Sequence, residues 1–436
     1  MRMSSGLLPR CCRYVASAVL LAVAAVVFSA SAGCAAQNQR TVLRVIPYPD
    51  IPGDFDTMLA IVETGFEAQH PDIDLVLVRA DVSDVYDLGY LAKVLTADTG
   101  RDGVHIVESD TIMMGDLALA GILRPQTFSM TDWHPLIVQA TTVNGVRYGV
   151  PHWLCGNFLI TRDAQLAGSQ GVEDMYRRIR EIKPQGPWLA GNYAGNSYLV
   201  LYYTQAWGEN RPGTDDLQPA ITGAIDSGAV GTLSVATALC DENGANPCVD
   251  GTYYNDFSPI FERTVRGEYA ALQGFSESMW YMAQYGAISK EWYVSPLPVG
   301  RVNRNVLLGD AYIARKDMDT ATAAAAEKFY AFMMQDATYR DIIFSGGSRG
   351  GVPVPRYLAP ARLGIFDLPE LQADIYYRRI LAAMTSPGGT NYPNLYVPEN
   401  RDRIYEQVMP YLNGTMPVLP RRGIMQHEGV RRQISQ

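Results

Sequence analysis

Apolar and polar positions follow two different periods in the first part of the chain. Short apolar runs typical of buried strands alternate with segments in which apolar residues recur at helical spacing. The pattern predicts strand 41–47, helix 55–69, strand 73–79, helix 88–96, strand 104–107 and helix 113–120. Strands that alternate with helices form a parallel sheet covered by helices, and such sheets bind ligands beyond the carboxyl ends of their strands. We therefore expect an α/β lobe with ligand-binding residues directly after its strands.

Helical spacing dominates the second part of the chain. It predicts helices 173–183, 198–207, 217–227, 235–239, 257–266, 320–334, 368–384 and 401–412, with strands 268–274, 292–298 and 305–314 among them. About 400 residues exceed what one hydrophobic core usually supports, so two lobes are expected. We predict a first lobe in 34–150, a second lobe in 151–300, a return to the first lobe in 301–365, and C-terminal helices in 366–436 that pack on both lobes.

The first 33 residues have the composition of a signal peptide. Arg2, Arg10 and Arg13 precede an apolar run that ends in small residues, and this run is too short to cross a bilayer as a helix. The sequence Ser31-Ala-Gly-Cys34 resembles a bacterial lipobox, in which a lipid on Cys34 would attach the protein to a membrane. Ordinary cleavage in the same region is the alternative. Both predict an exported protein, extracellular or periplasmic.

Removal of the leader changes the charge balance. The remaining chain has 33 basic and 45 acidic residues, a formal charge of −12. This charge disfavours nucleic acid and anionic membrane surfaces and suits a small cationic ligand, although solubility alone would also explain it. The five histidines are scattered without paired-ligand spacing, so no metal site is predicted.

Six cysteines leave one thiol without an obvious partner. Cys240 and Cys248 flank a turn-forming segment and are expected to form a disulfide in an exported protein; a zinc site would need further ligands nearby. Cys155 lies in a strand-like segment, 148–162, that Gly149, Pro151 and Gly156 are expected to bend. An odd thiol in an exported protein is either reactive or a small buried apolar side chain.

Several acidic residues occupy positions where the pattern admits two readings. Asp110 follows the third strand as a ligand-binding residue or as the cap of the next helix, and Glu277 at a strand-to-helix turn has the same two readings. Asp310 interrupts a buried strand together with Gly309, and such local conflicts tend to mark functional sites.

The layout resembles type 2 periplasmic solute-binding proteins, a two-lobed α/β fold with a ligand cleft between the lobes. Two motifs resemble thiaminase I, also called thiamine pyridinylase. Tyr148-Gly-Val-Pro-His-Trp-Leu-Cys155 is similar to the segment that carries the family's nucleophilic cysteine, and Gly274-Phe-Ser-Glu277-Ser-Met is similar to the segment of its catalytic glutamate. Asp310 and Tyr48-Pro-Asp50 match two further family positions.

The resemblance implies a transferase that replaces the thiazole of thiamine by a small amine, pyridine base or thiol through a covalent intermediate on Cys155, with Glu277 as acid and base and with no cofactor. Asp310, Asp110, Tyr48, Trp153 and Tyr254 would bind substrate, with Glu108 as the competing choice for Asp110. Leu308 stands where a pocket tyrosine is expected from the family, so that contact is either lost or supplied by Tyr312. A monomer is expected. A solute-binding lipoprotein of an ABC transporter, with a thiamine-like cation or a sugar as ligand, is the alternative.

Overall fold

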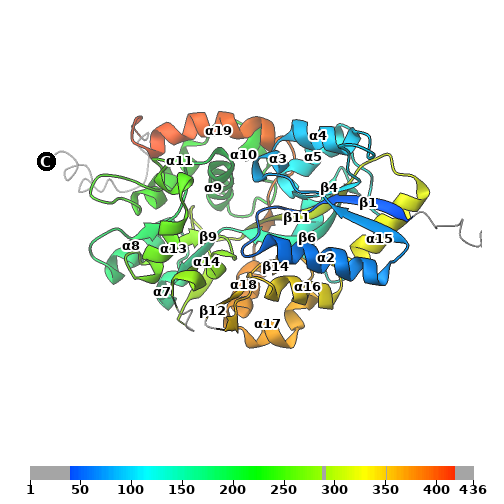
Figure 1. The fold of residues 1–436 in the computed structure, drawn as a ribbon. Helices are drawn as coiled ribbons and strands as arrows, with labels where there is room; N and C mark the ends of the chain where they lie inside the picture. Colours follow the sequence, from blue (N-terminus) through cyan, green and yellow to red (C-terminus); the bar gives the residue numbers. More distant parts are fainter. Residues whose placement is uncertain (1–39, 287–290, 350, 418–436) are drawn as a thin grey trace, which may run out of the picture.

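The structure is a computed structural model that describes residues 40–286, 291–349 and 351–417. The predicted signal peptide and Cys34 lie outside these residues. The described chain forms two main sheets, one of seven strands and one of four, with helices packed around both (Figure 1). None of the described helices is long and apolar enough to cross a membrane.

The first sheet contains the predicted parallel strands. Strands β1 (Thr41–Ile46), β2 (Ile73–Leu77) and β3 (Ile106–Asp110) pair in parallel, in the order β3-β1-β2. Their connections include helices α2 (Phe55–Gln69), α3 (Val82–Val85) and α4 (Leu88–Thr96), and α5 (Thr111–Leu119) follows β3. The predicted alternation of strands and helices is confirmed, but the third strand extends three residues further, so that Glu108 and Asp110 belong to the sheet itself.

Two long strands complete the first sheet and make it mixed. Strand β11 (Val306–Ala314) runs antiparallel between β3 and β6 (Gly149–Gly156), and all nine of its residues are buried. The short strands β14 (Ala359–Pro360) and β15 (Thr390–Asn391) pair with β6 and β11. A strand that is buried along its whole length reads as an uninterrupted apolar run, and Asp310 is the acidic exception within β11.

The second sheet has the order β10-β7-β9-β8. These strands are β7 (Phe158–Thr161), β8 (Leu189–Ala190), β9 (Ala271–Gly274) and β10 (Tyr293–Pro296). Helices around it include α8 (Val172–Ile182), α9 (Asn196–Glu209), α13 (Ser258–Val265) and α14 (Ser278–Tyr285). The predicted helices 217–227 and 235–239 are wrong, because Asp226 caps a single helix, α11 (Ser227–Ala238), by accepting a hydrogen bond from the Ala229 amide, and α10 (Gln218–Thr222) ends before it.

The chain crosses between the sheets at two places that lie side by side. Asn157 separates β6 from β7, and residues 297–305 lead from β10 back to β11; the amide of Leu297 donates to the Asn157 carbonyl at 3.0 Å. The first crossing therefore follows β6, whereas the boundary predicted after residue 150 falls inside that strand. Helix α19 (Val397–Leu412) lies along one edge of the molecule against α9, α11 and α5, and so spans both parts of it (Figure 1).

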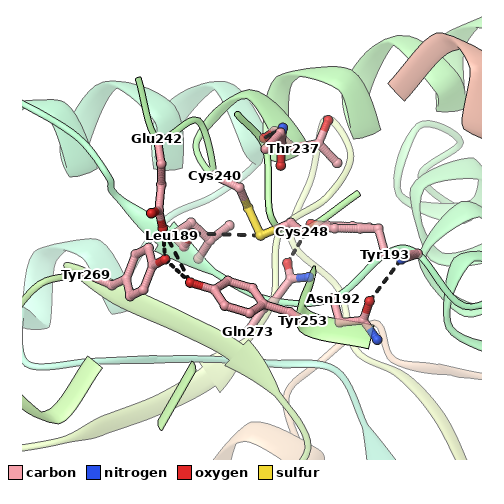
Figure 2. Close-up of a disulfide and its surroundings, with 12 residues drawn as sticks. Leu189, Asn192, Tyr193, Thr237, Cys240, Glu242, Cys248, Tyr253, Tyr269 and Gln273 are labelled. Atoms are coloured by element: carbon pink, nitrogen blue, oxygen red, sulfur yellow. Dashed lines mark hydrogen bonds between the residues drawn. A yellow bond between two sulfur atoms is a disulfide. The ribbon is translucent and has the colours of Figure 1, made fainter. Parts of the chain in front are cut away.

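A disulfide joins Cys240 and Cys248 beside the second sheet (Figure 2). The Cys248 carbonyl accepts a hydrogen bond from the Tyr193 amide at 2.7 Å, and Cys248 Sγ lies 4.0 Å from the Leu189 carbonyl of β8. Glu242, between the two cysteines, accepts hydrogen bonds from Tyr253 and Tyr269 (Figure 2). The turn-forming segment is thus fixed at both ends and in its middle.

Candidate functional site

Polar side chains from three neighbouring strands meet on one face of the first sheet. Asp310 on β11 lies directly opposite Asp110 on β3, and on its other side it pairs with Trp153 on β6. Side chains two residues apart on a strand share a face, so Cys155 lies on the same face as Trp153. The register thereby brings a thiol and two carboxyl groups together from segments about 45 and 155 residues apart in sequence.

A β-bulge shapes this part of β6. His152 is the extra residue opposite the step from Asp310 to Ala311, where the pairing register shifts. Its neighbour Pro151 has no amide hydrogen to donate to a ladder, so a bulge beside it is expected. Gly309 fits the same region for steric reasons, because a Cβ there would lie 2.2 Å from the Trp153 carbonyl oxygen. The predicted conflict at Gly309 therefore has a packing explanation, whereas that at Asp310 does not.

Cys155 is half-buried and is the free cysteine of the described residues. Its Sγ donates to Asp310 Oδ2 at 3.9 Å. Burial, followed by the charges of Asp310, Glu277 and Asp110, raises the pKa of Cys155 well above its ordinary value. The resting side chain is therefore a thiol, and it becomes a nucleophile only when a base removes its proton and positive charge offsets the surrounding carboxylates.

Asp110 and Asp310 form a pair of facing carboxyl groups, each about 95% buried. Burial raises the pKa of Asp110 to about 7. Burial together with the charge of Asp110 raises the pKa of Asp310 well above its usual value. Because two ionised carboxylates would repel each other, double ionisation is disfavoured and the pair holds a proton near neutral pH. A protonated carboxyl beside a carboxylate offers one donor and several acceptors to a ligand.

Both readings of Asp110 are realised in the structure. Its Oδ1 accepts a hydrogen bond from the Ile112 amide at 3.0 Å and so caps α5, while its Oδ2 accepts from the Tyr86 hydroxyl at 3.3 Å. The Tyr86 hydroxyl also lies 2.9 Å from that of Tyr48, and the two rings meet edge to face. The predicted Tyr48 therefore connects to Asp110 through Tyr86, which the sequence pattern did not single out.

Glu108, the competing choice for Asp110, is engaged within the protein. One carboxylate oxygen contacts His152 Nδ1, and the other accepts from the Tyr48 amide at 3.1 Å. The Tyr312 hydroxyl lies 3.0 Å from the same His152 nitrogen, and Tyr312 is 1% exposed. The carboxylate of Glu108 and the hydroxyl of Tyr312 thus both interact with His152. The hydroxyl of Tyr312, the residue expected to supply a pocket tyrosine, thus lies against His152.

Trp153 and Tyr254 differ sharply in exposure. Trp153 is 3% exposed, with its ring against His152 and Tyr339, so little of it is open for stacking on a ligand. Tyr254 is 50% exposed on the short helix α12 (Thr252–Asn255), close against Gly195 of the second lobe. Across the described residues, neither ring side chain hydrogen-bonds to Cys155, Asp310 or Asp110.

Glu277 immediately precedes α14, yet its side chain makes no capping hydrogen bond. Its Oε2 accepts from the hydroxyl of Ser276 at 3.2 Å. Burial, with a contribution from the charge of Asp50, raises the pKa of Glu277 to about 7. The side chain is half-buried and its charge acts on Cys155. Among the described residues, no group of three or more histidine, cysteine and acidic side chains could hold a metal ion.

Two sheets joined by paired chain crossings define a two-lobed periplasmic-binding-protein-like fold, and a thiol and carboxyl groups lie near the crossing. Solved structures share this fold. The GacH receptor of Streptomyces glaucescens GLA.O, determined unliganded and with acarbose, matches with a TM-score of 0.64 at 18% identity, covering 86% of this chain and 95% of the receptor.

The chain also resembles thiaminase I, in sequence and in structure. Thiaminase-1 of Paenibacillus thiaminolyticus is 23% identical over 376 residues, 82% of this chain and 86% of that protein. Thiaminase I from Bacillus thiaminolyticus has a TM-score of 0.67 at 22% identity over 86% of this chain and all of that chain. Clostridium botulinum thiaminase I in complex with thiamin has the same TM-score at 16% identity over 85% and 99%. No family model matches the sequence.

Proposed function

We propose that this protein is a thiamine-degrading transferase that carries the pyrimidinylmethyl group on Cys155. The observation on which the proposal rests is the thiol of Cys155 at 3.9 Å from Asp310, with the weakly engaged carboxyl of Glu277 acting on it by charge. A receptor needs neither a thiol nor a free base. Resemblance to thiaminase-1 over most of the chain supports the same activity.

In the first half-reaction, Glu277 takes the proton of Cys155. The thiolate then forms a C–S bond to an electron-poor ring carbon of the aminopyrimidine, and the ring accepts the electron pair. Cleavage of the bond from the methylene carbon to the thiazolium nitrogen sends its electrons to that nitrogen, so the thiazole leaves neutral. Asp310 and Asp110, which share a proton, bind the amino group and ring nitrogen and favour the electron-rich ring.

In the second half-reaction, a small nucleophile attacks the methylene carbon. Glu277, having released the thiol proton to solvent, accepts the proton of the nucleophile as the new bond forms. The ring electrons return and break the C–S bond, and the departing sulfur is reprotonated by Glu277. The cycle releases one proton, needs no cofactor and follows ping-pong kinetics.

The charges around Cys155 explain why its thiol stays protonated in the absence of substrate and becomes nucleophilic when thiamine binds. Burial and, after it, the charges of three carboxyl groups raise the pKa of Cys155 in the resting protein. The thiazolium of thiamine brings a positive charge to the same place, and an opposite charge lowers the pKa of a thiol. Substrate binding thus removes part of the barrier to forming the thiolate.

We also propose that the protein acts outside the cytoplasm, attached through a lipid on Cys34 or released. The disulfide between Cys240 and Cys248 supports an oxidising compartment, because such bonds are rare in the cytosol.

Product analysis separates the enzyme from a receptor. The purified protein is incubated with thiamine and aniline, and free thiazole and the pyrimidinylmethyl aniline are quantified by chromatography. The transferase forms both in equal amounts, and Cys155→Ser forms neither while still binding thiamine in calorimetry. Intact thiamine bound by both proteins, with no thiazole released, would identify a solute-binding protein instead.

A further inference from the structure

Aromatic side chains from several elements of the second lobe surround Glu277. Tyr281 lies four residues after Glu277 on α14, so the two side chains project from the same side of the helix. The ring of Tyr281 stacks on Phe261 of α13 at 4.9 Å and 14°. Phe275, two residues before Glu277, contacts the ring of Tyr198 of α9 at 6.4 Å.

The two tyrosines near Glu277 have hydroxyl groups without a hydrogen-bond partner in the described part of the protein. In the described ranges, neither the hydroxyls of Tyr198 and Tyr281 nor the carboxylate of Asp50 hydrogen-bonds to another residue. Asp50 follows β1 in the first lobe, yet its charge acts on Tyr198, Tyr281 and Glu277 of the second. Two carboxyl groups and two phenols from both lobes therefore lie within electrostatic range of one another, with their hydrogen-bonding capacity available to a ligand.

These residues differ in chemistry from the aspartate pair. Asp110 and Asp310 are about 95% buried within the sheet, whereas Asp50 is exposed and Tyr198, Glu277 and Tyr281 are half-buried. Aromatic faces bind rings and cations, and carboxylates attract cations and repel anions. We name Asp50, Tyr198, Glu277 and Tyr281 the aromatic–carboxylate patch.

Resting on the proposed function, we infer that the aromatic–carboxylate patch binds the second substrate and selects ring-containing bases with neutral or positive charge over anionic nucleophiles. The rings of Tyr198 and Tyr281 hold the base, Asp50 supplies the charge preference, and Glu277 is placed to take the proton of an attacking amine. Asp50 is thereby a specificity-determining residue.

Three pyridines that differ only in the charge of their 3-substituent test this inference. The probes carry a trimethylammoniomethyl, a carboxamide or a carboxylate group, and the ring nitrogen is the nucleophile in all three. We expect the wild-type kcat/KM to fall from the cationic to the anionic probe. Asp50→Asn reduces the ratio of the cationic to the anionic value about fivefold, as removal of one partly solvated charge predicts.

The matched control is Asp102→Asn, which makes the same charge change at an exposed residue of the first lobe and leaves the ratio unchanged. A ratio that stays constant in Asp50→Asn, or falls equally in both variants, would overturn the inference. Single-turnover thiazole release without any pyridine keeps the two proposals apart. Its absence in the wild type contradicts transfer through Cys155, whereas its presence with a constant ratio contradicts only the second-substrate site.

Discussion

Two glutamates of the second lobe have raised pKa values for the same reason but stand in different surroundings. Burial raises the pKa of Glu209 to about 8 and that of Glu277 to about 7. Glu209 accepts hydrogen bonds from the Gln205 side chain at 2.8 Å and from the Val299 amide at 2.8 Å, and from the Gly300 amide. Glu277 has the hydroxyl of its neighbour Ser276.

This difference distinguishes a glutamate that stabilises the fold, Glu209, from one that can act as a base, Glu277. Glu209 is fully buried and fixes the chain where it crosses between the lobes, so no ligand reaches it. Glu277 is half-buried, keeps acceptor positions free and acts on the one free thiol of the described chain. A perturbed pKa marks a candidate functional residue. Free hydrogen-bonding positions beside a thiol distinguish Glu277 from an acid that is only buried in the core, such as Glu209.

The largest expected effect comes from removing the base. Glu277→Gln is expected to reduce kcat/KM for thiamine by about 10²–10⁴, the usual contribution of a positioned general base. Glu209→Gln is the matched control, because it makes the same substitution at the other raised glutamate and leaves the base in place. Initial rates with saturating aniline measure both. Equal losses in the two folded variants would remove the distinction between them.

A smaller loss is expected at the carboxyl that receives the thiol hydrogen bond. Asp310→Asn breaks up the proton-sharing pair with Asp110, which carries the negative charge proposed to bind substrate, and a hydrogen bond to a charged group contributes about 1.5–3 kcal/mol, or roughly 10–150-fold in kcat/KM. Asp110→Asn also disturbs the cap of α5, so its thermal stability must be compared in parallel. A thiamine affinity by calorimetry that Asp310→Asn leaves unchanged would contradict a binding role for this residue.

The pH dependence of kcat/KM is expected to follow the ionisation of Glu277. A general base acts as the carboxylate, so with a pKa of about 7 the value of kcat/KM falls as the pH drops below 7, by about tenfold per unit. Glu209→Gln keeps this inflection because the base is untouched. Rates between pH 5 and 9 in constant ionic strength measure it, and a profile that is flat from 5 to 8 speaks against Glu277 as the base.

The smallest effect is on stability. Glu209 binds its proton more tightly when folded, with a pKa of about 8, than when unfolded, where glutamate has a pKa of about 4.3. Its contribution is therefore present below about pH 4.3 and lost as the pH rises through 8. Thermal unfolding of Glu209→Gln should depend less steeply on pH over this window than that of the wild type. An identical slope would contradict the raised pKa of Glu209.

The sequence pattern was sufficient for the parallel strands of the first sheet and insufficient for its antiparallel strands and for the second lobe. The β1–α2–β2 unit follows strict apolar periodicity, and local pattern determines such units. Helices α10 and α11 depend instead on the Asp226 cap and on burial of apolar residues around most of α11, which has no polar face to mark it. The insertion of β11 between β3 and β6 is a long-range pairing that no local pattern encodes.

The candidate site shows the same limit. Asp310 was identifiable because an acid in a buried strand conflicts with its environment, and Cys155 because it is the odd thiol. Glu277 was identified by the resemblance of its motif, since an acid at the start of a helix is also explained by the helix dipole. Tyr86 and Tyr198 carry no such conflict, since aromatic residues beside helices are usually core. Trp153 resembled a ligand platform, but the bulge at His152 sets it against Tyr339. Only the register of three strands shows which of these residues meet.

The intact mass of the protein after mixing with thiamine alone tests the central claim most directly. The account predicts an increase by one aminopyrimidinylmethyl group on Cys155 in the wild type and in Glu209→Gln, removed when aniline is added. Cys155→Ser should show no increase, and Glu277→Gln should gain it far more slowly. An unmodified wild-type mass, with thiazole released only once aniline is added, would mean that the nucleophile attacks thiamine directly, and Cys155 would not be the carrier.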